Sequence, residues 1–275
     1  MCLPGTIETV RDTQTQVTRR AVLAGGGAAA LAALAPGEAF AHKPKRRRRS
    51  GKVVDLTHTF TAGFPVYSGN PPSRRTLVTV QQDGFYAQEW TFGEHSGTHM
   101  DAPGHFVVGG RFVPQLSARE LILPIVVIDI ASRAARDPDT AVTPDDLRRF
   151  ERRHGRIPGN ALVAMDSGWS AKLGTPAFTG RDGSGVYHFP GFGAEAIEFL
   201  LDRRRAAAIG VDTLSLDPGP STTFAAHTQW LGADNYGLEN LANLGSIPRH
   251  GAVATVGVIP WEEGSGGPAR VLATY

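Results

Sequence analysis

The sequence contains a single cysteine, Cys2, among its 275 residues. If the N-terminal segment that contains Cys2 is removed, the mature chain has no thiol. A cysteine nucleophile, a thiolate-bound structural zinc and a disulfide framework are then excluded. Stability must then come from a hydrophobic core, and a hydrophobic content of 41% is ordinary for a globular protein of this length. Internal repeats and a heptad array are also absent from the sequence.

An apolar run long enough to span a bilayer is missing as well. Thr18-Arg19-Arg20 precedes fifteen Ala, Gly, Leu and Val residues that end at Ala35, fewer than the roughly 18–20 that a spanning helix needs. Ala39-Phe40-Ala41 supplies small residues at the positions that an exporting peptidase reads. This pattern predicts that residues 1–41 are a twin-arginine signal peptide, with a retained membrane anchor as the alternative. We therefore expect the Tat export machinery as a partner and a periplasmic or extracellular location.

Positive charge is scarce in the body of the chain, because much of it lies in residues 42–52. This segment contains seven basic residues: Lys43, Lys45, Arg46, Arg47, Arg48, Arg49 and Lys52. From Val53 onward, 18 Lys and Arg residues stand against 23 Asp and Glu, a net charge of −5. A basic run can bind nucleic acid or anionic lipid, but without interleaved aromatic residues it favours a solvated, disordered leader. We expect no nucleic-acid partner, and a single domain over residues 53–275.

The segment from His95 to His105 gathers three of the nine histidines and the carboxylate of Asp101 into eleven residues. Imidazole and carboxylate groups are ligands for a divalent ion such as zinc or manganese, at about 2.0–2.2 Å from the metal. On a straight strand His95 and His99 would stand about 13 Å apart, too far to share an ion. Gly97 permits the bend that is needed, and Pro103 argues against a continuous helix. The segment predicts a metal site in a turn at the end of a strand. The alternative, histidines that serve only as hydrogen-bonded polar groups, would need many buried partners.

The pattern H-x-G-T-H-x-D-x-P-x-H, read from His95 to His105, resembles the signature of the cyclase family of metal-dependent hydrolases. This family includes bacterial kynurenine formamidases, isatin hydrolases and some lactonases. Two further stretches are similar to the family. Before the motif, residues 53–58 and 64–69 resemble the family's opening strand and its aromatic turn. After the motif, residues 209–217 with His227 and Glu239 resemble the second half of the family's site.

The resemblance implies roles for individual residues. His95, His99 and Asp101 would hold a first metal, His227 a second, and Asp101 and Glu239 would reach toward both, so that one or two zinc or manganese ions bind per subunit. His105 would be the proton shuttle. Tyr67 stands in the aromatic turn that would line the substrate pocket, so it would either contact the substrate or simply pack against the protein. We expect Trp there in the formamidases, which puts an aryl formamide substrate in doubt. The resemblance also implies a homo-oligomer, either a dimer or a tetramer.

Local patterns predict strands near residues 77–80, 89–92, 125–130, 161–165 and 253–259, and helices over Pro144–His154 and Ala194–Ala207. Thr143 can cap the first helix, with Pro144 in its first turn. Strands and helices alternate irregularly, which predicts a mixed α/β domain. The resemblance sharpens this to the swivelling β/β/α architecture. Asp212 and Asp217 are each open to two interpretations, as residues that orient a ligand imidazole or as turn caps.

The sequence therefore predicts an exported hydrolase that cleaves an amide or ester bond of a small molecule. A bound metal can lower the pKa of water from 15.7 to about 7, and His105, with an ordinary pKa of about 6.5, would pass the proton to the leaving atom. The expected enzyme acts on C–N bonds other than peptide bonds, as an arylformamidase-like enzyme or a cyclic amidase. Ser167 is a poor nucleophile candidate, because Met165 replaces the first glycine of G-x-S-x-G. The alternatives are a metal-dependent cyclase or dehydratase and a non-catalytic metal-binding protein of the envelope.

Changing Arg19 and Arg20 together to Lys tests the predicted export signal. We expect uncleaved, folded precursor to accumulate in the cytoplasm, because the arginine pair is the address that the machinery reads. Cell fractionation and the mass of the retained chain measure this outcome. Secretion at the rate of the unchanged chain would show that the pair is not the signal.

Overall fold

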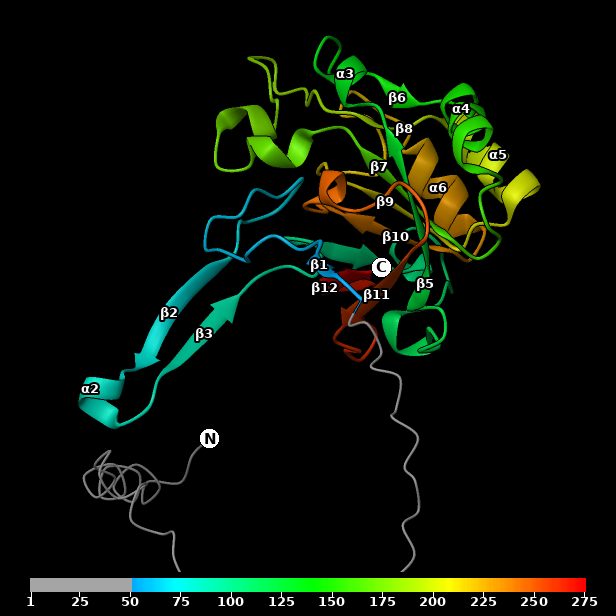
Figure 1. Cartoon of the computed structure of the whole chain (residues 1–275). Helices are drawn as coiled ribbons and strands as arrows, with labels where there is room; N and C mark the ends of the chain where they lie inside the picture. The colour runs from blue at the N-terminus through cyan, green and yellow to red at the C-terminus, as the bar shows by residue number, and fades with distance from the viewer. Residues whose placement is uncertain (1–50) are drawn as a thin grey trace, which may run out of the picture. The chain divides into compact units, whose positions relative to one another are not determined.

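The structure, a computed structural model, describes residues 51–275 (Figure 1). The predicted signal peptide, residues 1–41, and residues 42–50 of the basic leader lie outside the described residues. The described chain forms two compact units, residues 74–90 and residues 51–73 together with 91–275. Among residues 51–275, no helix is both long and apolar enough to cross a membrane.

The smaller unit is a hairpin. Strands β2 (Ser73–Val78) and β3 (Ala87–Thr91) pair with each other, and helix α2 (Val80–Asp83) lies between them in the sequence. The side chain of Thr79 caps α2 by accepting a hydrogen bond from the Gln82 amide. This cap explains why the strand expected at residues 77–80 ends at Val78: the backbone turns into a helix one residue later.

The larger unit contains an eight-stranded sheet that closes on itself. Its strands, in spatial order, are β1 (Val53–Asp55), β12 (Gly266–Thr274), β11 (Ala252–Val258), β5 (Ile122–Asp129), β7 (Leu162–Asp166), β9 (Ala208–Val211), β10 (Tyr236–Glu239) and β4 (His99–Asp101). Strand β4 pairs with β10 on one side and with β12 on the other. This double pairing closes seven of the strands into a barrel, and β1 pairs with β12 beside β4, along the same edge of β12.

Two hydrophobic cores support the sheet. One fills the barrel and includes Met100, Ile125 and Leu238. The other lies between the outer face of β5, β7 and β9 and three helices (Figure 1): α4 (Pro144–His154), α5 (Ala194–Arg204) and α6 (Ala225–Gly232). All five residues of β7 are buried, as expected for a parallel strand that is covered on both faces. The predicted mixed α/β class is confirmed.

Short elements complete the larger unit. Strands β6 (Ala141–Val142) and β8 (Gly191–Phe192) form a parallel pair, and α3 (Ala131–Ala134) follows β5. The 3₁₀ turns are η2 (Pro103–His105), η3 (Val113–Gln115), η4 (Trp169–Lys172), η5 (Pro176–Phe178) and η6 (Leu244–Ser246).

One helix prediction is more accurate than the other, because the two helices are terminated in different ways. Helix α4 spans the predicted residues, since Thr143 and Asp146 form a reciprocal capping box. Helix α5 ends at Arg204, earlier than the predicted Ala207, because Arg205 takes a left-handed conformation with φ of 53°. Strand β12 and helix α6 were not predicted from the sequence.

Candidate metal centre and substrate pocket

Strand β4 places His99 and Asp101 on the outer face of the barrel. Side chains alternate along a strand, so Met100, between them, points into the barrel core and is fully buried. His99 and Asp101 therefore share the opposite face, and both are buried. The closing strand of the barrel is thus also the strand that carries two of the predicted ligands.

A bend at Gly97 brings His95 back toward this strand. Gly97 has φ of +69°, and an added Cβ would lie 2.6 Å from Cδ2 of Phe60, so glycine is required there for two reasons. The bend sets Nδ1 of His95 2.6 Å from Oδ1 of Asp101. The turn predicted between His95 and His99 is present, and it is followed by a strand rather than by further loop.

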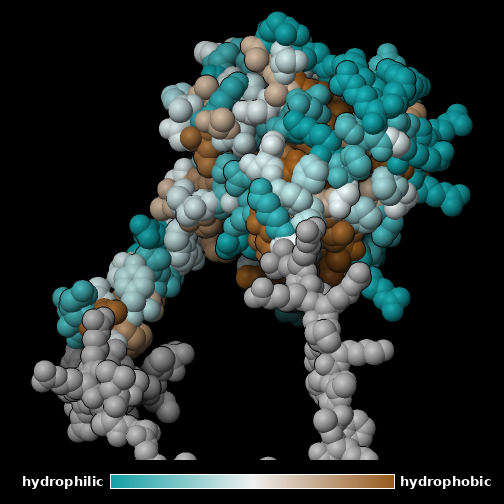
Figure 2. Space-filling model, viewed as in Figure 1, coloured by the Kyte–Doolittle hydropathy of each residue, from teal (hydrophilic) through white to brown (hydrophobic). Residues whose placement is uncertain are grey.

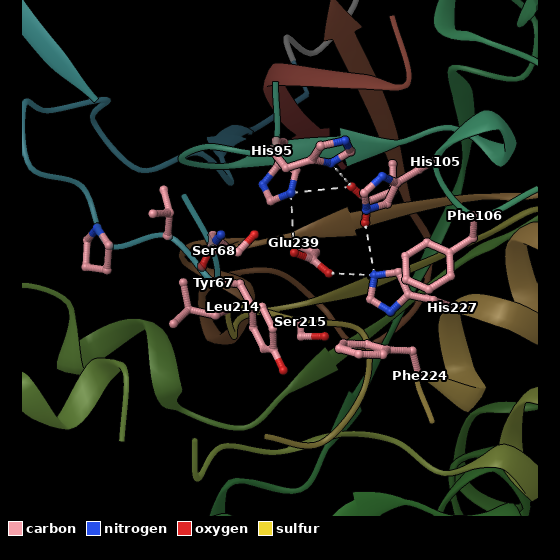
Figure 3. A pocket seen from close by; sticks show the side chains of 15 residues that line it. Tyr67, Ser68, His95, His105, Phe106, Leu214, Ser215, Phe224, His227 and Glu239 are labelled. Atoms are coloured by element: carbon pink, nitrogen blue, oxygen red, sulfur yellow. Dashed lines mark hydrogen bonds and ion pairs between the residues drawn. The ribbon is translucent and has the colours of Figure 1, made fainter. Parts of the chain in front are cut away.

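Glu239 and His227 approach from the other half of the chain. Glu239 lies directly opposite His99 in the pairing of β10 with β4, and its Oε2 is 3.3 Å from Nε2 of His99. Helix α6 carries His227, whose Nε2 is 3.2 Å from Oε1 of Glu239 and 3.5 Å from Oδ2 of Asp101. Figure 3 shows Glu239 and His227 turned toward each other, with His95 and His105 close by.

The five side chains form two overlapping groups with metal-ligand spacing. One group is His95, His99 and Asp101, and the other is Asp101, His227 and Glu239; within each, the ligand atoms lie within 4.8 Å of one another. Two ligands at about 2.1 Å from a tetrahedral ion stand roughly 3.4 Å apart, close to the 3.2–3.5 Å between His99, His227 and the carboxylates. The structure thus brings together all five predicted ligands, while their coordination of a metal stays a prediction.

Hydrogen bonds hold each imidazole with one nitrogen facing the carboxylates. Nδ1 of His99 donates to the Gly97 carbonyl at 2.9 Å, and Nδ1 of His227 donates to Oδ2 of Asp217 at 2.6 Å, which leaves Nε2 of both rings for the site. His95 instead presents Nδ1, because its Nε2 lies 3.1 Å from the Ser265 hydroxyl. Orientation of ligand rings by such partners is typical of metal sites.

Two atoms at the centre of the site lack hydrogen-bond partners among the described residues: Nε2 of His99 and Oδ2 of Asp101. Buried polar atoms without partners are costly, so their presence fits a divalent cation between them. Burial opposes charge on His99, yet Asp101 and Glu239 outweigh it and raise the pKa of His99 to about 10. The neighbouring imidazoles likewise outweigh burial and hold the pKa of Asp101 well below its usual range. The residues present are thus arranged around positive charge, and a metal would replace imidazole protons there.

His105 lies beside the ligand groups rather than within them. Its ring stacks on His95 at 3.7 Å between centroids and lies 6.1 Å from the ring of His227. Desolvation, helped by the two neighbouring imidazoles, lowers the pKa of His105 to about 4, although Asp101 and Glu239 oppose the shift. The expectation of an ordinary pKa near 6.5 is therefore wrong for this environment. His105 is neutral at neutral pH and can accept a proton.

A cavity of about 270 Å³ opens in front of the ligand groups. Three aromatic side chains, those of Tyr67, Phe106 and Phe224, form an aromatic wall on one side of it (Figure 3). Phe106 stacks on His227 at 4.6 Å, and Phe224 meets both Phe106 and Tyr67 at 5.8–5.9 Å. The volume suits a small molecule, and the wall suits a flat one.

Tyr187 fixes the position of Tyr67. Its hydroxyl donates to the Tyr67 carbonyl at 2.8 Å, and the two rings lie 4.8 Å apart. Tyr67 therefore lines the pocket and is also packed against the protein, so both interpretations of its sequence position apply.

The two aspartates that the sequence left open have different roles. Asp217 caps the start of α6, accepting from the amides of Ala226 and His227, and it also holds the His227 ring. Asp212 binds the Ser167 and Trp169 amides away from the ligand groups, and burial raises its pKa to about 6. Ser167 donates its hydroxyl to Asp212, is buried and does not line the pocket, so it has no access to a substrate there.

Sequence reasoning missed Phe106, Phe224, Ser215 and Asn240, which all line the pocket. Phe106 directly follows His105, and Phe224 precedes His227 by three residues, so proximity to the predicted site residues was an available signal. Asn240 holds the Gly97 carbonyl through its side-chain amide, a contact across 143 residues that no local pattern reveals.

Comparison with known proteins gives the family. Residues 54–218 match the family model described as "Putative cyclase". The chain is 35% identical to isatin hydrolase of Roseibium aggregatum over 242 residues, covering 81% of this chain and 91% of that protein. It is 25% identical to kynurenine formamidase of Bordetella petrii, covering 69% and 82%. The chain therefore belongs to the cyclase family, as the motif predicted, and in class it is a metal-dependent hydrolase.

Solved structures agree with this assignment. Isatin hydrolase A from Labrenzia aggregata, bound to benzyl benzoate, superposes with a TM-score of 0.77 at 33% identity, covering 81% of this chain and 93% of that one. Isatin hydrolase A from Ralstonia solanacearum gives the same TM-score at 34% identity, covering 81% and 91%. His227 and Glu239 lie beyond the residues that the family model matches but within the fold that these structures share.

The hydrogen bond from His227 to Asp217 generates a test of the metal centre. Asp217→Asn keeps the size of the side chain but removes the charge that orients the ring, and we expect metal affinity to fall about 10–100-fold. Competition with a chelator measures the affinity. Asp212→Asn is the matched control, since Asp212 is an equally buried aspartate without contact to a ligand. Equal affinities in the two variants would show that Asp217 serves only as a helix cap.

Proposed function

We propose that the chain hydrolyses an amide C–N bond in a small aromatic molecule, with a cyclic amide as the favoured substrate. The observation that carries this proposal is the aromatic wall of Tyr67, Phe106 and Phe224, which faces the ligand groups across one small cavity. A planar ring held against this wall places its carbonyl group toward His99 and Asp101. The relationship to isatin hydrolase, whose named substrate is such a molecule, supports the choice.

The residues have distinct roles in the proposed reaction. His95, His99 and Asp101 would hold one divalent ion, zinc or manganese, and Asp101, His227 and Glu239 a second. When bound, such an ion acts as a Lewis acid that polarises a carbonyl and acidifies water. The wall residues orient the substrate, and Phe106 and Phe224 limit access of further water to the His227 side of the cavity.

His105 moves the proton. A water oxygen forms a bond to the carbonyl carbon, the C–N bond breaks, and the proton released by the water passes to the neutral His105 ring and then to the leaving nitrogen. The stacked contact with His95 holds the His105 ring at the edge of the ligand groups. Because its pKa is lowered, the His105 ring is neutral at neutral pH, and its protonated form gives up the proton readily to the leaving nitrogen.

An aryl formamide is the second candidate substrate, favoured by the relationship to kynurenine formamidase. Tyr67 stands where we expect Trp in formamidases, and Tyr187 holds it in place. A cyclase or dehydratase reaction and simple metal binding are the remaining alternatives. Export through the twin-arginine route and a homo-oligomeric state are part of the proposal on sequence grounds.

A substrate screen tests the proposed function. The metal-loaded protein is offered isatin, an aryl formamide and an aromatic lactone, and products are identified by mass. We expect the cyclic amide to gain one water with the highest kcat/KM of the three. A product without added water would support the cyclase alternative, and the absence of turnover on all three would contradict the proposed substrate class.

The role of His105 is tested by comparing His105→Ala with His99→Ala. We expect His105→Ala to keep its metal and to lose roughly 10²–10⁴-fold in turnover, the usual contribution of general acid–base catalysis. His99→Ala should lose metal and turnover together. Metal stoichiometry and kcat are measured on the same preparations. Equal metal loss in both variants would make His105 a ligand, and full activity in His105→Ala would leave it a structural residue.

A further inference from the structure

Basic residues of the chain after Val53 are concentrated at one place. From Val53 onward the chain has 18 Lys and Arg residues, and eight of them are arginines in two short segments, residues 148–156 and 203–205. The eight are Arg148, Arg149, Arg152, Arg153, Arg156, Arg203, Arg204 and Arg205. The remaining part of the body is therefore strongly acidic, and the charge asymmetry is larger than the net charge suggests.

Tertiary structure joins the two segments into one surface, here called the basic surface. The first segment is the C-terminal half of α4 with the turn after it, and the second is the end of α5. Arg156 donates to the Arg203 carbonyl at 2.9 Å, and the guanidinium groups of Arg148 and Arg204 both lie over the Phe199 ring. Figure 2 shows long hydrophilic side chains standing out over α4 and α5.

Several of these charges are not neutralised within the fold. Arg148 pairs with Asp145, Arg149 with Asp146, and Arg204 with Glu151. Arg152, Arg153 and Arg205 are exposed and form no ion pair with any residue in 51–275, although the carboxylate of Asp202 lies in the same helix end. Cations in the last turn of a helix interact favourably with its dipole. That effect accounts for one or two residues per helix and not for arginines that follow the helix end, such as Arg156 and Arg205.

A partly apolar groove of about 360 Å³ adjoins the basic surface. The residues that line it include Pro124, Phe150 and Val253, together with His154 and Arg156. Val253 is 40% exposed although it is apolar. Val253 also pairs with Thr274, which pairs with Val53, so the first residue of β1 lies about two strand spacings, or 10 Å, from this groove.

The basic surface and the substrate pocket lie at opposite ends of the parallel strands. Helices α4 and α5 end just before β7 and β9 begin, whereas Glu239 is the last residue of β10, which runs parallel to β9. A flat partner bound at the basic surface would leave the pocket open. Binding at the surface and chemistry in the pocket are therefore separable in experiments.

We propose that the basic surface docks the protein on an anionic phospholipid membrane. The arginines would contact lipid phosphates, and the groove with Val253 would accept the upper part of a lipid, a combination of cationic and shallow apolar contacts that suits a membrane interface. Nucleic acid fits less well, because the arginines project from helix ends and the basic surface has no exposed Phe, Tyr or Trp ring on which a base could stack. The proposal does not depend on the substrate.

Vesicle sedimentation of the full chain tests this proposal. Vesicles of phosphatidylcholine with about one third phosphatidylserine are compared with phosphatidylcholine alone. We expect binding to the anionic vesicles at low salt, loss of binding at high salt, and a fall of about 10–100-fold in the partition coefficient for Arg152→Gln/Arg153→Gln/Arg205→Gln.

The matched control is Arg74→Gln/Arg119→Gln/Arg136→Gln, which removes the same charge from exposed positions elsewhere. Unchanged thermal unfolding and metal content in both triple variants verify that the fold is intact. Equal binding by the two triple variants would overturn the proposal, because the basic residues before β1 would then explain it. Tighter, salt-dependent binding to duplex DNA than to anionic vesicles would overturn it in favour of a nucleic-acid partner.

Discussion

The site depends on two buried carboxylates, Asp101 and Glu239, that lie on adjacent strands with little solvent between them. Two such charges repel each other and lose hydration, so the arrangement requires positive charge in the gap. His99 and His227 face the gap with their Nε2 atoms, and their pKa values are raised because the carboxylates outweigh the cost of burial. A divalent ion supplies the same positive charge and also gives a partner to Nε2 of His99 and Oδ2 of Asp101, which is why the geometry favours a metal centre over an ordinary ion-pair network.

The barrel holds the two carboxylates close together despite their repulsion, because it fixes the strands on which they lie. Strand β4 is bonded on both edges, to β10 and to β12, and its middle residue Met100 is fully buried in the barrel core. Repulsion between the carboxylates therefore cannot separate the strands without opening the barrel. The same rigidity serves the aromatic wall, since Tyr67 is held by Tyr187 and Phe106 packs flat on His227. Ligand groups and substrate surface are thus parts of one rigid frame.

Helices and strands were predicted well where hydrogen bonds between residues close in the sequence define their ends. Helix α4 follows its prediction because Thr143 and Asp146 cap each other within four residues. Helix α6 was missed because its N-cap position is Phe224 and the carboxylate that caps it, Asp217, lies eight residues before the helix, so the local sequence shows neither a capping residue nor a polar face. Strand β12 begins with Gly-Gly-Pro, which indicates a turn, and it is extended because β4 and β11 hydrogen-bond to it.

The sequence by itself determined the family, the mixed α/β class and the first half of the candidate site, because His95, His99, Asp101 and His105 lie within eleven residues and their spacing is a local property. The resemblance to the cyclase family added His227 and Glu239 to the predicted site. The tertiary structure alone decided that Glu239 stands opposite His99, that Asp217 orients His227, that burial lowers the pKa of His105, and that two arginine segments form one surface. These are contacts between residues far apart in the chain. They depend on which strands pair and which helices pack together, and no local pattern encodes that choice.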